Sequence, residues 1–182
     1  MDEKIVRQVI TKYLSKQGTK FSLQKEKEAG PDILIDGIAL EIKGSTFNIK
    51  PALEQFIKYA IRYADLQIAF PIDTLSIEFL YSLYALEWTI KYRPPSGPHL
   101  IKTYLVCKSN GEEYCVKRFE SIETLLEEIK KKIGQEAYLP LKSDETLMKN
   151  ALEIGSNISK VIKRSLEKEV ISFGHKVLLE NK

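Results

Sequence analysis

Apolar residues near the start of the chain recur at three- and four-residue steps, and further along they alternate with polar residues. The first pattern covers residues 2–17 and predicts an amphipathic helix. Residues 21–25 alternate, and residues 31–36 and 38–43 are two short runs of strand-forming residues. Asp36-Gly37 lies between these runs and is typical of a two-residue hairpin turn. The pattern therefore predicts a helix followed by three strands.

The helical spacing returns over residues 51–64, and Pro51 suits the first turn of that helix. LQIAF at positions 66–70 is a mostly apolar run closed by Pro71, which predicts a buried strand. Residues 74–92 are apolar almost all the way around a helix, so we expect a helix in the core or at an interface.

Two further runs, at 100–107 and 113–119, flank Ser109-Asn110-Gly111 and predict a second hairpin. Ser121 then caps an amphipathic helix, and a long helical pattern extends from about Asp144 into the 170s. The predicted fold class is therefore α/β: a helix, a three-strand meander, a helix and a strand, followed by a second hairpin and C-terminal helices.

This order divides the chain into two parts. Residues 1–140 are predicted to form the α/β domain, and residues 141–182 a C-terminal helical extension. The apolar stripe of the extension runs from Leu147 to Val161. We expect this stripe either to pack on the domain or to form a homodimer interface.

The composition of the chain excludes several classes of protein. The chain has 182 residues and a formal charge of +3, which is too small for a protein that coats phosphate backbones with basic residues. Its two cysteines are too few for a disulfide framework or a four-thiolate zinc site. No signal peptide and no membrane-spanning apolar run is evident, so we expect a cytoplasmic protein with no membrane partner.

The first predicted hairpin is the part of the sequence that most clearly indicates a site for metal binding and catalysis. With a two-residue turn, Ile35 pairs with Ile38, and the same register places Asp32 directly opposite Glu41 on a face shared with Lys43. Opposed like charges are destabilising, so two carboxylates there call for a cation between them. Oxygen ligands at that separation suit Mg²⁺ or Mn²⁺, and Lys43 is placed to stabilise a phosphate or to orient and deprotonate an attacking water. The hairpin therefore predicts metal-assisted phosphodiester hydrolysis.

Pro31-Asp32 followed by Glu41-Ile42-Lys43 resembles the PD-(D/E)xK signature of the restriction-endonuclease-like nucleases. The element order over residues 1–70 is similar to the core of that superfamily. The resemblance implies a restriction-endonuclease-like fold and a DNA substrate. It also implies that Asp32, Glu41 and the carbonyl of Ile42 bind the metal, and that Lys43 acts on the nucleophile or the transition state.

A second motif follows the catalytic lysine. Gln55 and Tyr59 resemble the QxxxY motif of RecB-like nucleases. They lie one helical turn apart and share a face with Arg62. This spacing would let them contact Lys43 or the nucleic-acid backbone.

Many members of the superfamily also carry an acid on the first helix. Glu3 is the best-placed candidate here, and Glu26 and Glu28, just before the motif, are competitors. The size of the chain, this acid and the compact motif are also similar to archaeal Holliday-junction resolvases.

Basic residues gather on one side of the last predicted helix and are candidates for phosphate contacts: Lys160, Lys163, Arg164 and Lys168. Glu167 and Glu169 are interleaved with them, which favours an ordinary solvated face instead.

Two groups of residues are expected to be structural. A two-residue turn at Asn110-Gly111 would place Cys107 and Cys115 on opposite faces of the hairpin, so we expect two reduced, buried cysteines. The second group is aromatic, and we favour core packing for it over stacking against unpaired bases: Tyr81, Tyr84, Trp88 and Tyr92.

The sequence thus predicts a nuclease that depends on Mg²⁺ or Mn²⁺ and hydrolyses DNA. The alternative from a different class is a catalytically inactive nuclease-fold module that binds nucleic acid or a protein partner. A third interpretation is a structural domain in which Lys43 simply neutralises the two acids.

Overall fold

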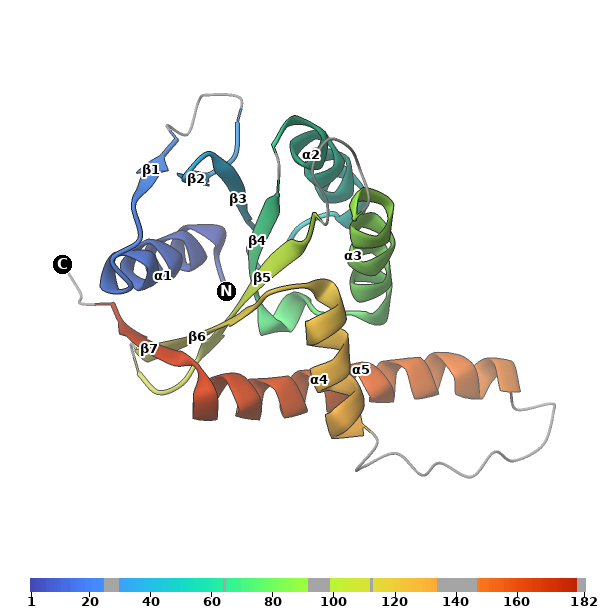
Figure 1. The fold of residues 1–182 in the computed structure, drawn as a ribbon. Helices are drawn as coiled ribbons and strands as arrows, with labels where there is room; N and C mark the ends of the chain where they lie inside the picture. Colours follow the sequence, from blue (N-terminus) through green and yellow to red (C-terminus); the bar gives the residue numbers. More distant parts are fainter. Residues whose placement is uncertain (25–29, 64, 92–98, 112, 134–146, 180–182) are drawn as a thin grey trace.

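The computed structural model describes residues 1–24, 30–63, 65–91, 99–111, 113–133 and 147–179, with the backbone alone for 132–133 and 147–159. These residues form a mixed α/β fold around one seven-stranded sheet (Figure 1). The α/β class predicted from the sequence is confirmed.

The elements follow the predicted order closely. In chain order they are α1 (Glu3–Lys16), β1 (Phe21–Leu23), β2 (Ile33–Ile35), β3 (Ile38–Ile42), α2 (Ile49–Arg62), β4 (Leu66–Pro71), the short 3₁₀ helix η1 (Ile72–Thr74), α3 (Ile77–Ile90), β5 (Ile101–Lys108), β6 (Glu113–Phe119), α4 (Ile122–Ile133), α5 (Leu147–Phe173) and β7 (His175–Leu178).

The strands lie in the sheet in their sequence order, from β1 to β7. Strands β3, β4 and β5 are parallel to one another, and all other neighbours are antiparallel. Parallel neighbours require crossover connections, which α2 and α3 provide. The order helix, three strands, helix and strand is therefore the one predicted for the first part of the chain.

Helices cover both faces of the sheet (Figure 1). On one face, α1 packs with apolar residues of β2, β3 and β6, and its own contribution includes Val6, Val9 and Ile10. On the other face, helices α2 to α5 enclose a larger core that includes Phe56, Phe70 and Phe79. All six residues of β4 are buried, because this central strand has helices on both sides.

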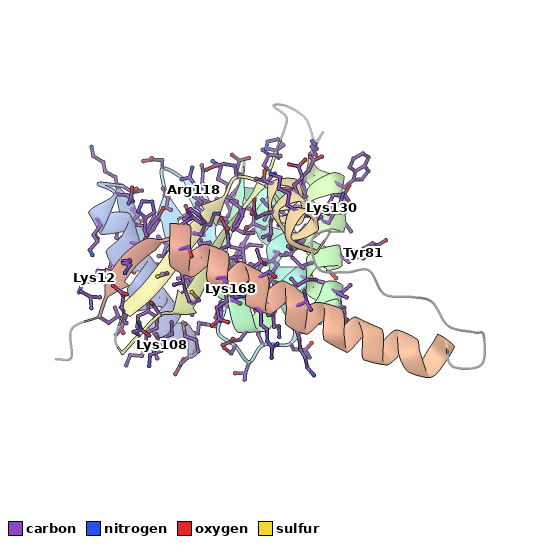
Figure 2. The ribbon with its side chains drawn as sticks, turned by 90° about the horizontal axis from the view of Figure 1, so that it is seen from below. Lys12, Tyr81, Lys108, Arg118, Lys130 and Lys168 are labelled. Carbon is purple, nitrogen blue, oxygen red and sulfur yellow. The ribbon has the colours of Figure 1, made fainter. Side chains whose placement is uncertain are left out.

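Helix α3, which we expected in the core or at an interface, is buried on one side only. The core packing favoured for Tyr81, Tyr84 and Trp88 is wrong, because these side chains are exposed on its outer side. Four large residues at three- and four-residue steps are exposed there, with Tyr81 73% and Trp88 60% exposed. Tyr81 points away from the molecule (Figure 2). We call this set the α3 stripe: Ile77, Tyr81, Tyr84 and Trp88. Tyr92 lies outside the described residues.

One carboxylate on the inner side of α3 connects three elements. Glu87 is buried and accepts backbone hydrogen bonds from Ile101 at 2.8 Å, from Ile122 at 2.9 Å and from Glu123 at 3.3 Å. Ile122 and Glu123 begin α4, and a helix N-terminus leaves such N–H groups without partners of its own. Glu87 therefore joins α3 to the start of β5 and caps α4.

The second hairpin has a longer turn than the predicted two residues. The Ser109 N–H donates to the Glu113 carbonyl at 2.9 Å, and Cys107 pairs directly with Cys115 across the strands. The expectation that the two cysteines lie on opposite faces is therefore wrong. Both are buried and free, as predicted.

The C-terminal part of the chain returns to the sheet. The second half of α5 places Ile162, Leu166 and Val170 in the larger core, whereas its first half extends past α4 (Figures 1 and 2). Strand β7, which the sequence did not predict, then pairs with β6 and buries Val177. In the part of the chain that the structure describes, no helix has the length and apolar character needed to cross a membrane.

Candidate active site

The first hairpin forms as its turn residues predict. Asp36 and Gly37 both have positive φ, at 49° and 81°, which suits a two-residue hairpin turn. Ile35 pairs with Ile38, and Leu34 with Ala39. Alternate residues therefore face opposite sides of the sheet: an apolar set packs under α1, and the opposite face of the hairpin carries Glu41.

Asp32 directly precedes β2 and is fixed to the neighbouring strand. Its Oδ2 accepts the backbone N–H of Ile42 at 2.8 Å. This bond places the Asp32 carboxylate beside Glu41, the residue before Ile42 on β3. The side chain of Ile42 is buried on the α1 side, so this residue faces the site through its backbone only.

Glu41 is the most constrained acid of the site. It is 3% exposed, and its Oε1 accepts from Lys43 Nζ at 2.6 Å, while its Oε2 is buried with no hydrogen-bond partner among the described residues. Burial, together with the neighbouring Asp32 charge, raises the pKa of Glu41 to about 7 against the opposing effect of Lys43. The strand thus holds a carboxylate that is costly to ionise even beside Lys43.

Lys43 connects β3 to helix α2 through a chain of hydrogen bonds. Its Nζ also donates to Gln55 Oε1 at 2.9 Å, and Gln55 Nε2 donates to the Tyr59 hydroxyl at 3.0 Å. That hydroxyl donates to the carbonyl of Gly30 at 2.5 Å, two residues before Asp32. The predicted contact of Gln55 with Lys43 is therefore present, and the chain of contacts ends next to the first acid.

Helix α1 brings two charged residues toward the acids. Glu3 is exposed, but partial burial raises its pKa, with Lys43 opposing the change and Asp32 adding to it. A Cβ atom on Gly44 would lie 2.6 Å from the backbone nitrogen of Glu3, so a glycine after Lys43 permits this close approach. One turn after Glu3, Arg7 donates to the carbonyls of Gln24 at 2.7 Å and Asp32 at 3.2 Å.

The predicted nucleic-acid contacts are divided between two places. Arg62 stacks on Tyr63, with 5.7 Å from its Cζ to the ring centroid, and it lines an open groove of about 490 Å³ together with Gln55, Lys58 and Tyr59. In contrast, no hydrogen bond or ion pair of the described residues joins the α5 residues Lys160, Lys163 and Arg164 to the acids. Lys163 instead donates to the carbonyl of Asp73 in η1 at 2.8 Å. The competitors Glu26 and Glu28 lie outside the described residues.

The acids form an all-oxygen donor set, which suits Mg²⁺ or Mn²⁺ better than a soft transition metal. The buried, unpaired Oε2 of Glu41 is a donor that such a cation would satisfy. Within the described ranges, no three His, Cys, Asp or Glu side chains converge into a complete metal site by themselves. Water and substrate phosphate commonly complete the coordination of Mg²⁺. The residues therefore fit an ion that takes some of its ligands from the protein and the others from water or phosphate.

Sequence reasoning missed two members of this arrangement, the guanidinium of Arg7 and the carbonyl of Gly30. Arg7 had a weak signal, because it follows Glu3 by four residues and shares its helix face. The carbonyl of Gly30 had none, because a backbone acceptor carries no sequence signature.

Comparisons of the chain with protein-family models, with curated proteins and with solved structures gave no match. The case for a function therefore depends on the chemistry of these side chains.

Proposed function

We propose that the protein is a nuclease that depends on Mg²⁺ or Mn²⁺ and hydrolyses DNA phosphodiester bonds through a PD-(D/E)xK-type site. One observation carries the proposal: two adjacent carboxylates, one of them with a buried unpaired oxygen, lie beside a lysine whose amine is held by two hydrogen bonds. Most buried polar side-chain atoms in proteins have a hydrogen-bond partner, so this oxygen, next to a second carboxylate, is open to a cation.

Each residue has a role that follows from its position. Asp32 and Glu41, with the carbonyl of Ile42, would hold the divalent ion. When bound, that ion supplies Lewis acidity toward a phosphate oxygen and lowers the pKa of a nucleophilic water. The Lys43 ammonium, kept in place by Gln55, is positioned to stabilise negative charge that develops on the phosphate. Arg62, on the rim of the groove, is suited to bind the backbone of the nucleic acid.

A cleavage assay tests the proposal. Branched, single-stranded and duplex oligonucleotides are incubated in Mn²⁺ with the protein and with Asp32→Ala, Glu41→Ala and Lys43→Ala. Each substitution is expected to abolish metal-dependent cleavage while the far-UV circular dichroism spectrum stays unchanged. Lys50→Ala is the matched control, because Lys50 is exposed on α2 away from Gln55 and Tyr59. Undiminished cleavage by all three site variants would contradict the proposal.

One observation favours the alternative of a module that binds a partner without cutting. The α3 stripe exposes large apolar side chains, and such patches often mark sites of protein interaction. Calorimetric titration separates the two functions. Absence of binding up to millimolar Mg²⁺ or Mn²⁺ would favour the module, whereas a nuclease must bind the ion.

A further inference from the structure

Arg7 contacts Asp32, whereas Lys43 contacts the other acid, Glu41. Its guanidinium Nη1 lies 3.8 Å from Asp32 Oδ1, and its Nη2 donates to the backbone carbonyls of Asp32 and Gln24. The other oxygen of Asp32 accepts from the Ile42 N–H. One oxygen of the Asp32 carboxylate therefore accepts a backbone N–H, and the other lies near the Arg7 guanidinium.

The charges of the site are almost balanced by the protein itself. Three carboxylates are coupled electrostatically, those of Glu3, Asp32 and Glu41. Two fixed cations lie among them: Lys43 binds Glu41, and Arg7 lies against Asp32. With all three acids ionised the formal charge of this set is −1, which one divalent ion more than neutralises.

Two-ion sites need carboxylates free to be shared by cations about 3.5–4 Å apart. Arg7 lies near both acids that a second ion would need: it contacts Asp32, and it follows Glu3 by one helical turn and interacts with it electrostatically. We propose that Arg7 takes the place of a second cation, so that the site binds a single divalent ion. This inference rests on the proposed function, because it assumes that the acids bind a metal.

Counting bound Mn²⁺ tests this inference without reference to activity. Equilibrium dialysis, with free Mn²⁺ read from its electron paramagnetic resonance signal, gives the number of ions bound at saturation. The wild-type protein is expected to bind one equivalent. Arg7→Gln, which keeps a hydrogen-bond donor but removes the charge, is expected to bind two. Arg7→Lys, which keeps the charge, is expected to bind one.

The outcomes separate this inference from the proposed function. No binding to the wild-type protein would overturn the proposed function and the inference with it. Two equivalents bound by the wild type, or one bound by both Arg7 variants, would overturn the role of Arg7 while leaving a metal-dependent enzyme. Two equivalents bound by Arg7→Lys would show that the charge is not the cause. Thermal unfolding confirms that each variant is folded, and the wild-type count tests the inference even if a variant is not.

Discussion

The carboxyl group of Glu41 is buried, and its raised pKa makes stability depend on pH. A folded-state pKa of about 7, above the usual 4.5, gives a stabilisation that is full below pH 4.5 and is lost as the pH rises through 7. With metal chelated, the free energy of unfolding should therefore fall by about 2 kcal/mol more between pH 5 and pH 8 in the wild type than in Glu41→Gln. Urea unfolding in EDTA at both pH values measures the difference. Parallel pH profiles for the two proteins would contradict the assignment.

Gln55 is expected to act through Lys43 rather than on the substrate. Gln55→Ala removes one of the two hydrogen bonds that hold the ammonium. Because loss of a residue that orients a functional group typically costs activity about 10- to 100-fold, we predict a fall of that size in kcat with little change in KM. Single-turnover cleavage in Mn²⁺ measures it, and Lys50→Ala on the same helix is the control. A change confined to KM would instead indicate that Gln55 binds the substrate.

Asp32, Glu41 and Lys43 could be located from the sequence because the Asp36-Gly37 turn fixes the register of the hairpin. The contact between Gln55 and Lys43 followed from a motif. Arg7 could not be located in the same way, since its contact with Asp32 depends on how closely α1 packs on the sheet. Local patterns therefore predicted the residues on one hairpin, and tertiary packing determined which others join them.

Among the elements, Glu87 is the polar group that joins α3 to the start of β5 and to the start of α4. Glu87→Ala would leave three backbone N–H groups without their acceptor, two of them at the start of α4. Each hydrogen bond to a charged group contributes about 1.5–3 kcal/mol, but the contributions of neighbouring bonds do not add. We therefore predict that the free energy of unfolding falls by about 3 kcal/mol. Urea unfolding measures it. Glu78→Ala, an exposed acid on the same helix, should change stability by less than about 1 kcal/mol. Equal effects of the two substitutions would exclude the capping role.

Two elements show where sequence patterns are insufficient. The pattern of α3 is apolar all round, yet its outer side is exposed, because hydrophobicity alone does not say how many neighbours a helix has. Strand β7 is short, and Val177 is its one buried residue, so it lacks the alternation that marks a strand. It pairs with the edge of β6, an edge that offers unpaired backbone groups to another strand.

At the scale of the whole molecule, the described C-terminal residues and the site belong to one sheet. Val177 is fully buried beside β6, and its neighbour Leu178 is 54% exposed. Val177→Ala should lower the free energy of unfolding by about 1–2 kcal/mol, and Leu178→Ala by less than about 0.5 kcal/mol. Because the fold is expected to unfold cooperatively, the fluorescence of Trp88, on α3, and far-UV circular dichroism should shift together. A Trp88 transition left unchanged by Val177→Ala would show that the last strand unfolds independently.

The net charge of +3 gave no indication of a polyanionic substrate. The local arrangement gives the reason: three acids and two bases gather at one site, so the charge that meets a phosphate would come partly from a bound ion. We propose that Lys43 acts in metal-dependent hydrolysis of DNA at this site.

The most direct test compares Mn²⁺-dependent cleavage by the wild type and by Lys43→Met, which removes the ammonium but keeps most of the apolar stem. Both proteins are first shown to be folded and to bind Mn²⁺. We predict that the wild type cleaves DNA and that the variant is about 100- to 1,000-fold slower. Cleavage at the same rate by both proteins, or no cleavage by the metal-loaded wild type of any DNA form tested, would contradict it.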